Sequence, residues 1–331
     1  MTASSVPLWR RFGWPIVIVI AALPIALWHD ASYALNILAY TYLFAGLALA
    51  WNLIGGFGGQ FSLGHGAFFG VGAYGVAGLY LNHGWSPIAT LLPVALIAAV
   101  AGWLLSWPTF RLRGPFFAIA TMAMNEVFFA LANYFESITG GPAGLSIPFV
   151  ANPVNFIFEE SRSYTLLMYG FMLVALAVSA LFIRSRIGHY LIAVREDEDA
   201  AAASGVNVLR VKCIAMAVSA GLTAIGGGLF AMYVRIVDPP SVFTLADTGL
   251  KFALLPLIGG AGTLLGPIVG AGLIVPLETV LRGMLSEFRP GLAALATGAV
   301  MIVAALYLKN GIVGAVQQGI ERIQRRRGRD E

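Results

Sequence analysis

The stretch that decides the fold is GGFGGQFSLGHGAFFGVGA, residues 55–73, which directly follows an apolar run and holds eight glycines. In a helix in water, each glycine costs about 1 kcal/mol relative to alanine. Between membrane helices, by contrast, small residues let two backbones approach closely, and Gly66 and Gly70 form a G-x-x-x-G motif. We therefore predict a membrane span at residues 61–81 that packs against other helices, away from lipid.

The sequence on either side of this stretch has the composition of a membrane protein. Hydrophobic residues make up 59% of the 331 residues and charged residues only 11%, whereas soluble domains contain about 25% charged residues. A bilayer core about 30 Å thick is crossed by about 20 apolar helical residues. Windows of this length with at most one charge occur at residues 33–54, 61–81, 88–107, 115–134, 164–183 and 213–234.

Four further apolar windows are shorter or carry a charge near one end: residues 14–28, 250–265, 267–281 and 291–308. With these windows included, we predict an all-α polytopic membrane protein of about ten transmembrane helices (8–10), with glycine-rich breaks. The window at residues 14–28 is either the first span or the core of a signal peptide, because Arg10 and Arg11 precede it.

The distribution of basic residues gives the expected orientation. With ten spans and a cytoplasmic amino terminus, only five of the 20 Lys and Arg residues lie outside the cell: Arg162, Arg235, Lys251, Arg282 and Arg289. This excess on the cytoplasmic side agrees with the positive-inside rule and places both termini there. We expect one membrane domain over residues 1–331, with cytoplasmic segments at 1–13, 184–210 and 310–331 and an external loop at 135–163.

Two glycine-rich interruptions are candidates for a gate. GGFGG starts at Gly55 and GGAGT starts at Gly259, and each follows an apolar run. Paired interruptions in the two halves of a transporter indicate a path between repeats; chance pairing among 39 glycines is the alternative. The gate candidates are Gly55, Gly56, Gly58, Gly59, Gly259, Gly260, Gly262 and Gly266.

Polar residues near the first break and within residues 115–134 are candidates for lining a pathway: Ser62, His65, Thr121, Asn125 and Glu126. Glu126 is expected to face a bundle interior, because a carboxylate at mid-bilayer costs about 2.5–3.5 kcal/mol on insertion scales. It either binds a substrate ammonium or gates the path, or it makes a structural hydrogen bond to a neighbouring helix. For His65, the alternatives are a pathway role and a packing role.

The loop at residues 184–210 contains a predicted amphipathic helix. Ile187, Tyr190, Leu191 and Val194 have helical spacing, and Gly205 can end the helix in the left-handed conformation. Four acidic residues at 196–199 favour docking in a partner's groove over lying on anionic lipid, where a basic polar face is expected. The residues expected to couple to a partner are Ile187, Gly188, Tyr190, Leu191, Val194, Arg195, Glu196, Glu198 and Gly205.

The sequence does not indicate catalytic or cofactor chemistry. One Cys excludes an internal disulfide and a multi-cysteine metal site, and the four His residues are scattered. A P-loop needs a Gly-Lys pair, and none of the three Lys residues follows a glycine. We therefore expect a protein that is not an enzyme and has no cofactor, so that any ATP that drives it is bound and hydrolysed by another chain.

Taken together, these segments resemble the permease subunits of branched-chain amino-acid ABC importers, of the LivM type. The matching segments follow in order at residues 55–74, 111–127, 139–145, 187–212 and 259–271. One departure is TGGPAGL at 139–145, where many relatives carry a polar residue after the second glycine. This departure weakens any statement about the substrate.

The resemblance implies a transport subunit for Leu, Ile or Val in the bacterial inner membrane, forming half of an alternating-access pathway. It implies as partners a second, related permease, two cytoplasmic ABC ATPase subunits and a periplasmic substrate-binding protein, with residues 187–205 as the coupling helix. ABC permeases for urea, short amides or other small polar solutes share much of the pattern. A proton-coupled secondary transporter that uses Glu126 is the alternative from another class. Membrane lipid is an expected partner and nucleic acid is not.

Overall fold

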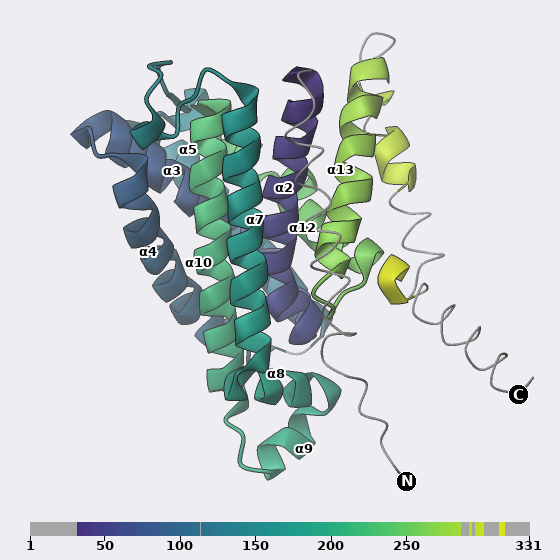
Figure 1. Ribbon diagram of the computed structural model, residues 1–331. Coiled ribbons are helices and arrows are strands. Elements are labelled where there is room, and N and C mark those ends of the chain that lie inside the picture. Colours follow the sequence, from purple (N-terminus) through teal and green to yellow (C-terminus); the bar gives the residue numbers. More distant parts are fainter. Residues whose placement is uncertain (1–31, 113, 286–290, 293–294, 301–310, 315–331) are drawn as a thin grey trace, which may run out of the picture.

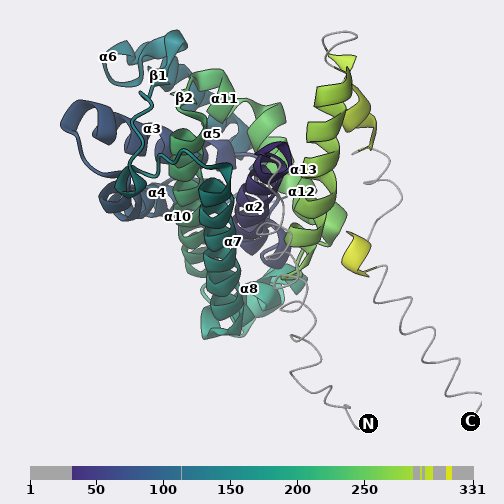
Figure 2. The same cartoon turned by 45° about the horizontal axis from the view of Figure 1, so that its top comes forward.

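The computed structural model describes residues 32–112, 114–285, 291–292, 295–300 and 311–314 (Figure 1). Its long helices run side by side, with β1 and α6 at one end of the bundle and α8 and α9 at the other (Figures 1 and 2). We call these ends the β1 end and the α8 end. The elements are α2 (Ser32–Asn52), η1 (Leu53–Phe57), α3 (His65–His83), α4 (Pro87–Thr109), α5 (Pro115–Tyr134), α6 (Glu136–Thr139), η2 (Gly141–Ala143), β1 (Leu145–Ser146), η3 (Pro153–Asn155), α7 (Ser161–Arg184), α8 (Arg186–Glu196), α9 (Glu198–Ala203), α10 (Val208–Val234), β2 (Ile236–Val237), α11 (Pro239–Phe243), η4 (Leu245–Gly249), α12 (Leu250–Gly259) and α13 (Gly266–Leu285).

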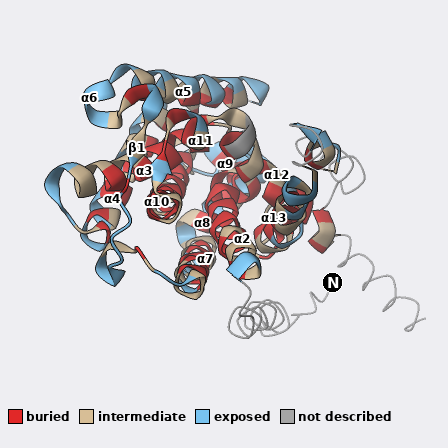
Figure 3. Cartoon of the chain, turned by 90° about the horizontal axis from the view of Figure 1, so that it is seen from above, coloured by how far each residue is buried: buried red, intermediate tan, exposed pale blue. Residues whose placement is uncertain are grey.

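Helices α2 and α10 form the centre of the bundle. Most of their residues are buried, and they pack against each other. Helix α2 also contacts α7, α12 and α13, whereas α10 contacts α3 and α4. The outer faces of α4 and α5 are exposed (Figure 3), as expected for faces that meet lipid or another subunit.

The all-α prediction is confirmed, and the expected number of spans is not. Among the described residues, six helices are long and apolar enough to cross a membrane, one of them α2 continued through η1. The predicted span at 14–28 lies outside the described residues, and the window at 291–308 lies largely outside them. A two-residue antiparallel pair, β1 with β2, ties the loop at 135–163 to the residues after α10.

Helix α3 packs inside the bundle, as the glycine-rich sequence predicts. Ala73 and Ala77 have no exposed surface, and Gly70 lies against the ring of Phe243. The helix contacts α10, α4, α5 and α11. Its start differs from the predicted residue 61, since helix α3 begins at His65. The packing prediction is confirmed, but α3 is not one of the six helices that are long and apolar enough to cross a membrane.

The first glycine break also begins later than predicted. Gly55 and Gly56 continue the chain of α2 as the π-helical turn η1, and the irregular segment runs from Gly58 to Gly64. The side chain of Trp51 anchors this segment, because its Nε1 donates a hydrogen bond of 2.7 Å to the carbonyl of Ser62. The irregular backbone is thereby held against the core.

The window predicted as one span at 250–265 is instead half of a discontinuous segment. Helix α12 ends at Gly259, and the short helix α11 and the turn η4 precede it. Ten residues of α12 rise about 15 Å, which is about half of a bilayer core. The prediction was wrong here because the glycines at 259–260 end the helix before the apolar sequence ends.

The predicted helix at 187–205 is two helices. Asp197 interrupts it with extended backbone, and its side chain caps α9 by accepting hydrogen bonds from the backbone N–H groups of Asp199 and Ala200. Gly205 has φ of +86°, so the prediction of a left-handed glycine after this helical region is confirmed. Helices α8 and α9 project at one end of the bundle (Figure 1).

Candidate functional site

The two glycine breaks lie against each other at the α8 end, joined by one side chain. The amide nitrogen of Asn52 donates to the carbonyl of Thr263 at 2.9 Å, and the amide oxygen of Asn52 accepts from the backbone N–H of Gly262, also at 2.9 Å. Asn52 has no exposed surface and directly precedes η1. Segments that are far apart in sequence therefore form one unit, and Asn52 is a residue that the sequence analysis did not identify.

Arg195 of α8 connects to both breaks. Its Nη1 donates a hydrogen bond of 3.1 Å to the carbonyl of Gly56, and its methylene stem lies against Gly59. Gly262 has φ of +75°, and a Cβ atom there would lie 2.6 Å from Arg195 Nη1. A side chain at position 262 would therefore be strained in its backbone and would also push the guanidinium away.

The apolar stripe of α8 faces its own chain. Leu191 and Val194 are buried, and Leu191 packs in a cluster with Ile54, Phe57 and Val211. Tyr190 is exposed, as is Glu196. The apolar stripe is therefore occupied by contacts within this chain and the outer face of α8 is polar, whereas the sequence pattern suggested that the apolar stripe enters a partner's groove.

The acidic turn after α8 is partly used inside the chain. Glu198 forms an ion pair of 2.8 Å with Lys212, whose side chain is only 2% exposed. Lys212 also lies over the ring of Phe110, 5.9 Å from its centroid. The ion pair joins α9 to the second turn of α10.

His65 and Ser62 belong to a buried hydrogen-bond network. The two ring nitrogens of His65 lie 3.0 Å from Ser62 Oγ and 2.8 Å from Ser219 Oγ. Ser219 in turn donates to the carbonyl of Ala50 at 2.6 Å. His65 thus joins α3, α10 and α2 with both nitrogens in contact with hydroxyl groups, which supports the packing role that the sequence left open for it.

Thr121 and Asn125 lie on the buried face of α5. The hydroxyl of Thr121 accepts a hydrogen bond of 3.0 Å from the backbone N–H of Leu63, and Asn125 donates to the carbonyl of Phe243 at the end of α11. Asn125 Oδ1 is buried without a hydrogen-bond partner. These two residues connect α5 to the start of α3 and to the discontinuous segment.

Glu126 lies on the opposite, exposed face of α5, together with Ile119, Met122 and Val127. The sequence placed it with Thr121, but Thr121 is buried. Within the described part of the chain, no hydrogen bond or ion pair holds the Glu126 carboxylate. An acid in the middle of a spanning helix is costly against lipid. This face therefore requires water or another protein chain beside it.

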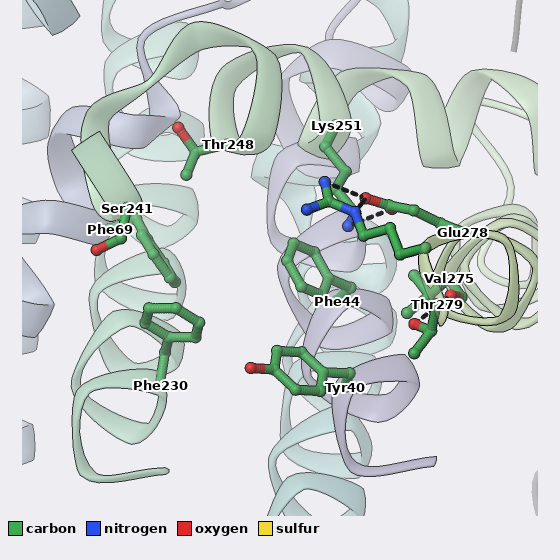
Figure 4. Close-up of a pocket in the computed structure, with 11 residues that line it drawn as sticks. Tyr40, Phe44, Phe69, Phe230, Ser241, Thr248, Lys251, Val275, Glu278 and Thr279 are labelled. Carbon is green, nitrogen blue, oxygen red and sulfur yellow. Dashed lines mark hydrogen bonds and ion pairs between the residues drawn. The ribbon is translucent and has the colours of Figure 1, made fainter. Parts of the chain in front are cut away.

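A cavity of about 420 Å³ lies between α2, α10, the discontinuous segment and α13 (Figure 4). Lys251 Nζ lies 2.6 Å from Glu278 Oε2, and Arg282 Nη2 lies 2.8 Å from Glu278 Oε1. The sequence analysis assigned Lys251 and Arg282 to the external side and missed this cluster. The sequence did contain a signal for this cluster, because Lys251 and Glu278 lie near the ends of the consecutive apolar windows at 250–265 and 267–281.

Comparison with known proteins identifies the family. Residues 33–305 match the family model described as branched-chain amino acid transport system / permease component. The high-affinity branched-chain amino acid transport system permease protein LivM of Salmonella typhimurium is 31% identical over 307 residues, covering 85% of this chain and 70% of that protein. Its counterpart in Escherichia coli K12 is 31% identical over 305 residues.

More distant relatives extend the similarity to other permeases. The LivH permease protein of Escherichia coli K12 is 24% identical over 82% of this chain and 91% of its own length. The autoinducer 2 import system permease LsrC of Salmonella paratyphi B is 24% identical over 62% of this chain and 58% of its own length. No solved structure matches the chain. With the family model covering most of the sequence, this chain belongs to the family of permease components of branched-chain amino acid transport systems.

Proposed function

We propose that this chain is a transmembrane permease subunit of an ABC importer that carries Leu, Ile or Val across the bacterial inner membrane. Two separate cytoplasmic ATPase subunits supply the energy, a second, related permease completes the pathway, and a periplasmic binding protein delivers the substrate. Membership of the permease family supports this proposal, and so does the similarity to both LivM and LivH, whose names state branched-chain amino acid transport.

The observation that carries the proposal is the contact of Arg195 with both glycine breaks. Helix α8 lies at the end of the bundle where the sequence places the cytoplasmic basic residues. A displacement of α8 by an ATPase would pull on the carbonyl of Gly56 and press on Gly262. Because Asn52 joins the two breaks, both would move together, in the manner of packed bundles that rock about a central site.

The ATPase contact falls on the outer surface of α8 and α9. Tyr190 and Glu196 are exposed there, whereas Leu191 and Val194 hold α8 to the bundle. The ion pair of Glu198 with Lys212 joins α9 to α10. A displacement of this surface would therefore be transmitted to the bundle through two contacts. Arg195 would transmit it to the glycine breaks, and the ion pair with Lys212 would transmit it to α10.

Reconstitution tests this function. The chain is coexpressed with candidate ATPase and permease subunits from the same genome, purified as a complex and placed in proteoliposomes with a candidate binding protein. Uptake of radiolabelled L-leucine that requires both ATP and the binding protein is the expected result. Failure of ATPase subunits to copurify, or uptake by the chain alone, would overturn the proposal.

Two alternative substrates or energy sources give distinct outcomes in the same assay. The similarity to LsrC, an autoinducer 2 import permease, keeps another small polar solute in an ABC system as the second candidate; urea or short amides would then be taken up with ATP in place of leucine. The position of Glu126 on an exposed face of α5 favours the third candidate, a proton-coupled carrier. That carrier would accumulate solute on a proton gradient without ATP.

A further inference from the structure

The cavity beside α13 has charged groups on one side and aromatic rings on the other. Lys251 and Glu278 lie at one wall, and Phe69 and Phe230 lie across the cavity from them (Figure 4). Arg282 pairs with Glu278 at the same wall. Phe44 lies between the two, with its ring centroid 4.1 Å from Lys251 Nζ. A small molecule that carries a positive and a negative charge at one end and an apolar group at the other matches this arrangement.

Fold stability does not account for these charges. Buried ion pairs in proteins contribute little net stability, and replacing one with apolar residues of similar size is often neutral or stabilising. Ionisable residues within membrane segments usually mark a substrate or ion path. Here the side chain of Glu278 is 9% exposed, and each of its two carboxylate oxygens is paired with a cation, Oε2 with Lys251 and Oε1 with Arg282.

The position of Lys251 gives a second reason to expect a ligand. Lys251 is in the first turn of α12, directly after the π-helical turn η4 of the discontinuous segment. Broken helices of this kind form the substrate sites of many transporters. Glu278 comes from the middle of α13, so a ligand held by both residues would bridge the half-helix and its neighbour.

A second cavity, of about 510 Å³, meets the first at Tyr40, which lines both. It is lined by residues near the β1 end, among them Glu159 and Arg235, and the ring of Tyr40 lies edge-on to Tyr233 at 5.2 Å. The charged cavity therefore has a neighbouring cavity toward the β1 end, and Tyr40 lines both.

We propose that the charged cavity binds a zwitterionic amino acid with an aliphatic side chain. The ligand carboxylate binds Lys251 and Arg282, its ammonium binds Glu278, and its side chain packs against Phe44, Phe69 and Phe230. The volume of about 420 Å³ lies within the usual range of small-molecule sites, about 300–1,000 Å³. A ligand with only an amine would pair with Glu278 alone, and a ligand with only a carboxylate would pair with Lys251 and Arg282 alone. The inference rests on the proposed function, because it places the substrate inside this chain.

Direct binding tests the site without transport. Binding of radiolabelled L-leucine is measured on the purified permease–ATPase complex in the absence of the binding protein. Saturable binding is expected, with 3-methylbutylamine and 4-methylpentanoate, which each keep one charge, competing at least about tenfold less well than leucine. A tenfold loss corresponds to about 1.4 kcal/mol of binding free energy.

The deciding variant is the double substitution Lys251→Met and Glu278→Leu, which removes both members of the buried pair together. Arg282 also loses its contact with Glu278 in this variant, but its side chain is 58% exposed and is not left as a buried charge. We expect it to assemble with the ATPases and to hydrolyse ATP, but to bind leucine at least about tenfold more weakly. Arg111→Met and Glu136→Gln, at exposed positions away from the cavity, are the matched controls and should bind like the wild type.

The outcomes separate the site from the proposed function. A double variant that binds leucine as the wild type does, or a wild-type complex without saturable binding, would overturn the site while ATPase assembly still supports the permease function. If the double variant does not assemble, the single variant Phe69→Leu tests the aromatic wall, and unchanged leucine affinity there would also count against the site. Absence of ATPase subunits from the wild-type preparation would instead count against the proposed function.

Discussion

Among single residues, Arg195 makes the contact on which the proposed coupling depends. The substitution Arg195→Met keeps an apolar stem against Gly59 but removes the hydrogen bond to the Gly56 carbonyl. Hydrogen bonds to charged groups are worth about 1.5–3 kcal/mol. We expect the complex to assemble and hydrolyse ATP while leucine transported per ATP falls at least about tenfold. Parallel measurement of uptake and phosphate release in proteoliposomes gives this ratio.

The matched control for this variant is Arg210→Met. Arg210 is exposed in the first turn of α10, and none of the contacts that join α8 to the breaks involves its side chain. Its transport per ATP should equal that of the wild type. An Arg195→Met complex with a normal ratio would show that α8 acts on the bundle by another route, of which the Glu198–Lys212 pair is the evident one.

Glu126 is the second residue whose substitution gives a clear expectation. Its carboxylate lies on an exposed face of a spanning helix, so it is expected to line the route between this chain and its partner permease. Glu126→Gln keeps the shape and removes the charge. We expect uptake of leucine to fall about tenfold, equivalent to about 1.4 kcal/mol, and the melting temperature of the purified chain to stay unchanged. Uptake equal to that of the wild type would contradict a role in the route.

In the second glycine break, the backbone conformation of Gly262 gives a test at the level of the element. Gly262→Ala places a methyl group where φ is +75° and where the guanidinium of Arg195 lies. We expect the variant to lower transport per ATP, as Arg195→Met does, because both changes separate α8 from the breaks. Gly272→Ala, in α13 with open space around the added methyl, should leave the ratio unchanged. A normal ratio for Gly262→Ala would mean that the second break does not take part in coupling.

The ends of helices were predictable where the sequence itself ends the apolar run. The window at 115–134 coincides with α5, because Gly114 and Pro115 start the helix. The window at 250–265 does not coincide with α12, since residues 261–265 remain uncharged after the helix ends. The interruption at Asp197 was also missed. Aspartate is a common N-cap residue, but it acts as one here only because α8 ends at Glu196, and the sequence does not show that end.

The candidate site was predictable in its residue types and not in its contacts. The glycines of both breaks and Arg195 were identified from the sequence, but their meeting depends on the packing of α2 against α12 and α13. Thr121 and Glu126 were grouped as neighbours along α5, although their side chains lie on opposite faces. The pairing of Lys251 with Glu278 needs the turn between α12 and α13, which residue spacing does not give.

Considered as a whole, the molecule has two structurally different ends. At the α8 end, Asn52 and Arg195 join segments from across the sequence. At the β1 end, the short pair of β1 with β2 and a polar cavity lined by Tyr40 stand above the charged cavity. Helix α12 lies between these ends: it contacts α2 and α13 and carries Lys251. Under the proposed function, α12 would therefore contact a substrate that enters at the β1 end and would also be displaced by a movement of α8.

This arrangement requires the α8 end to face the cytoplasm, which thiol labelling in spheroplasts can test. The single native cysteine, Cys213, is buried, so the wild type should label weakly. Ser204→Cys after α9 and Ser146→Cys in β1 are both at exposed positions. In cells without the partner ATPases, a membrane-impermeant maleimide should label Ser146→Cys in intact spheroplasts and Ser204→Cys only after permeabilisation. The reverse pattern would place α8 outside the cell, where no ATPase can reach it, and the proposed coupling through Arg195 would be wrong.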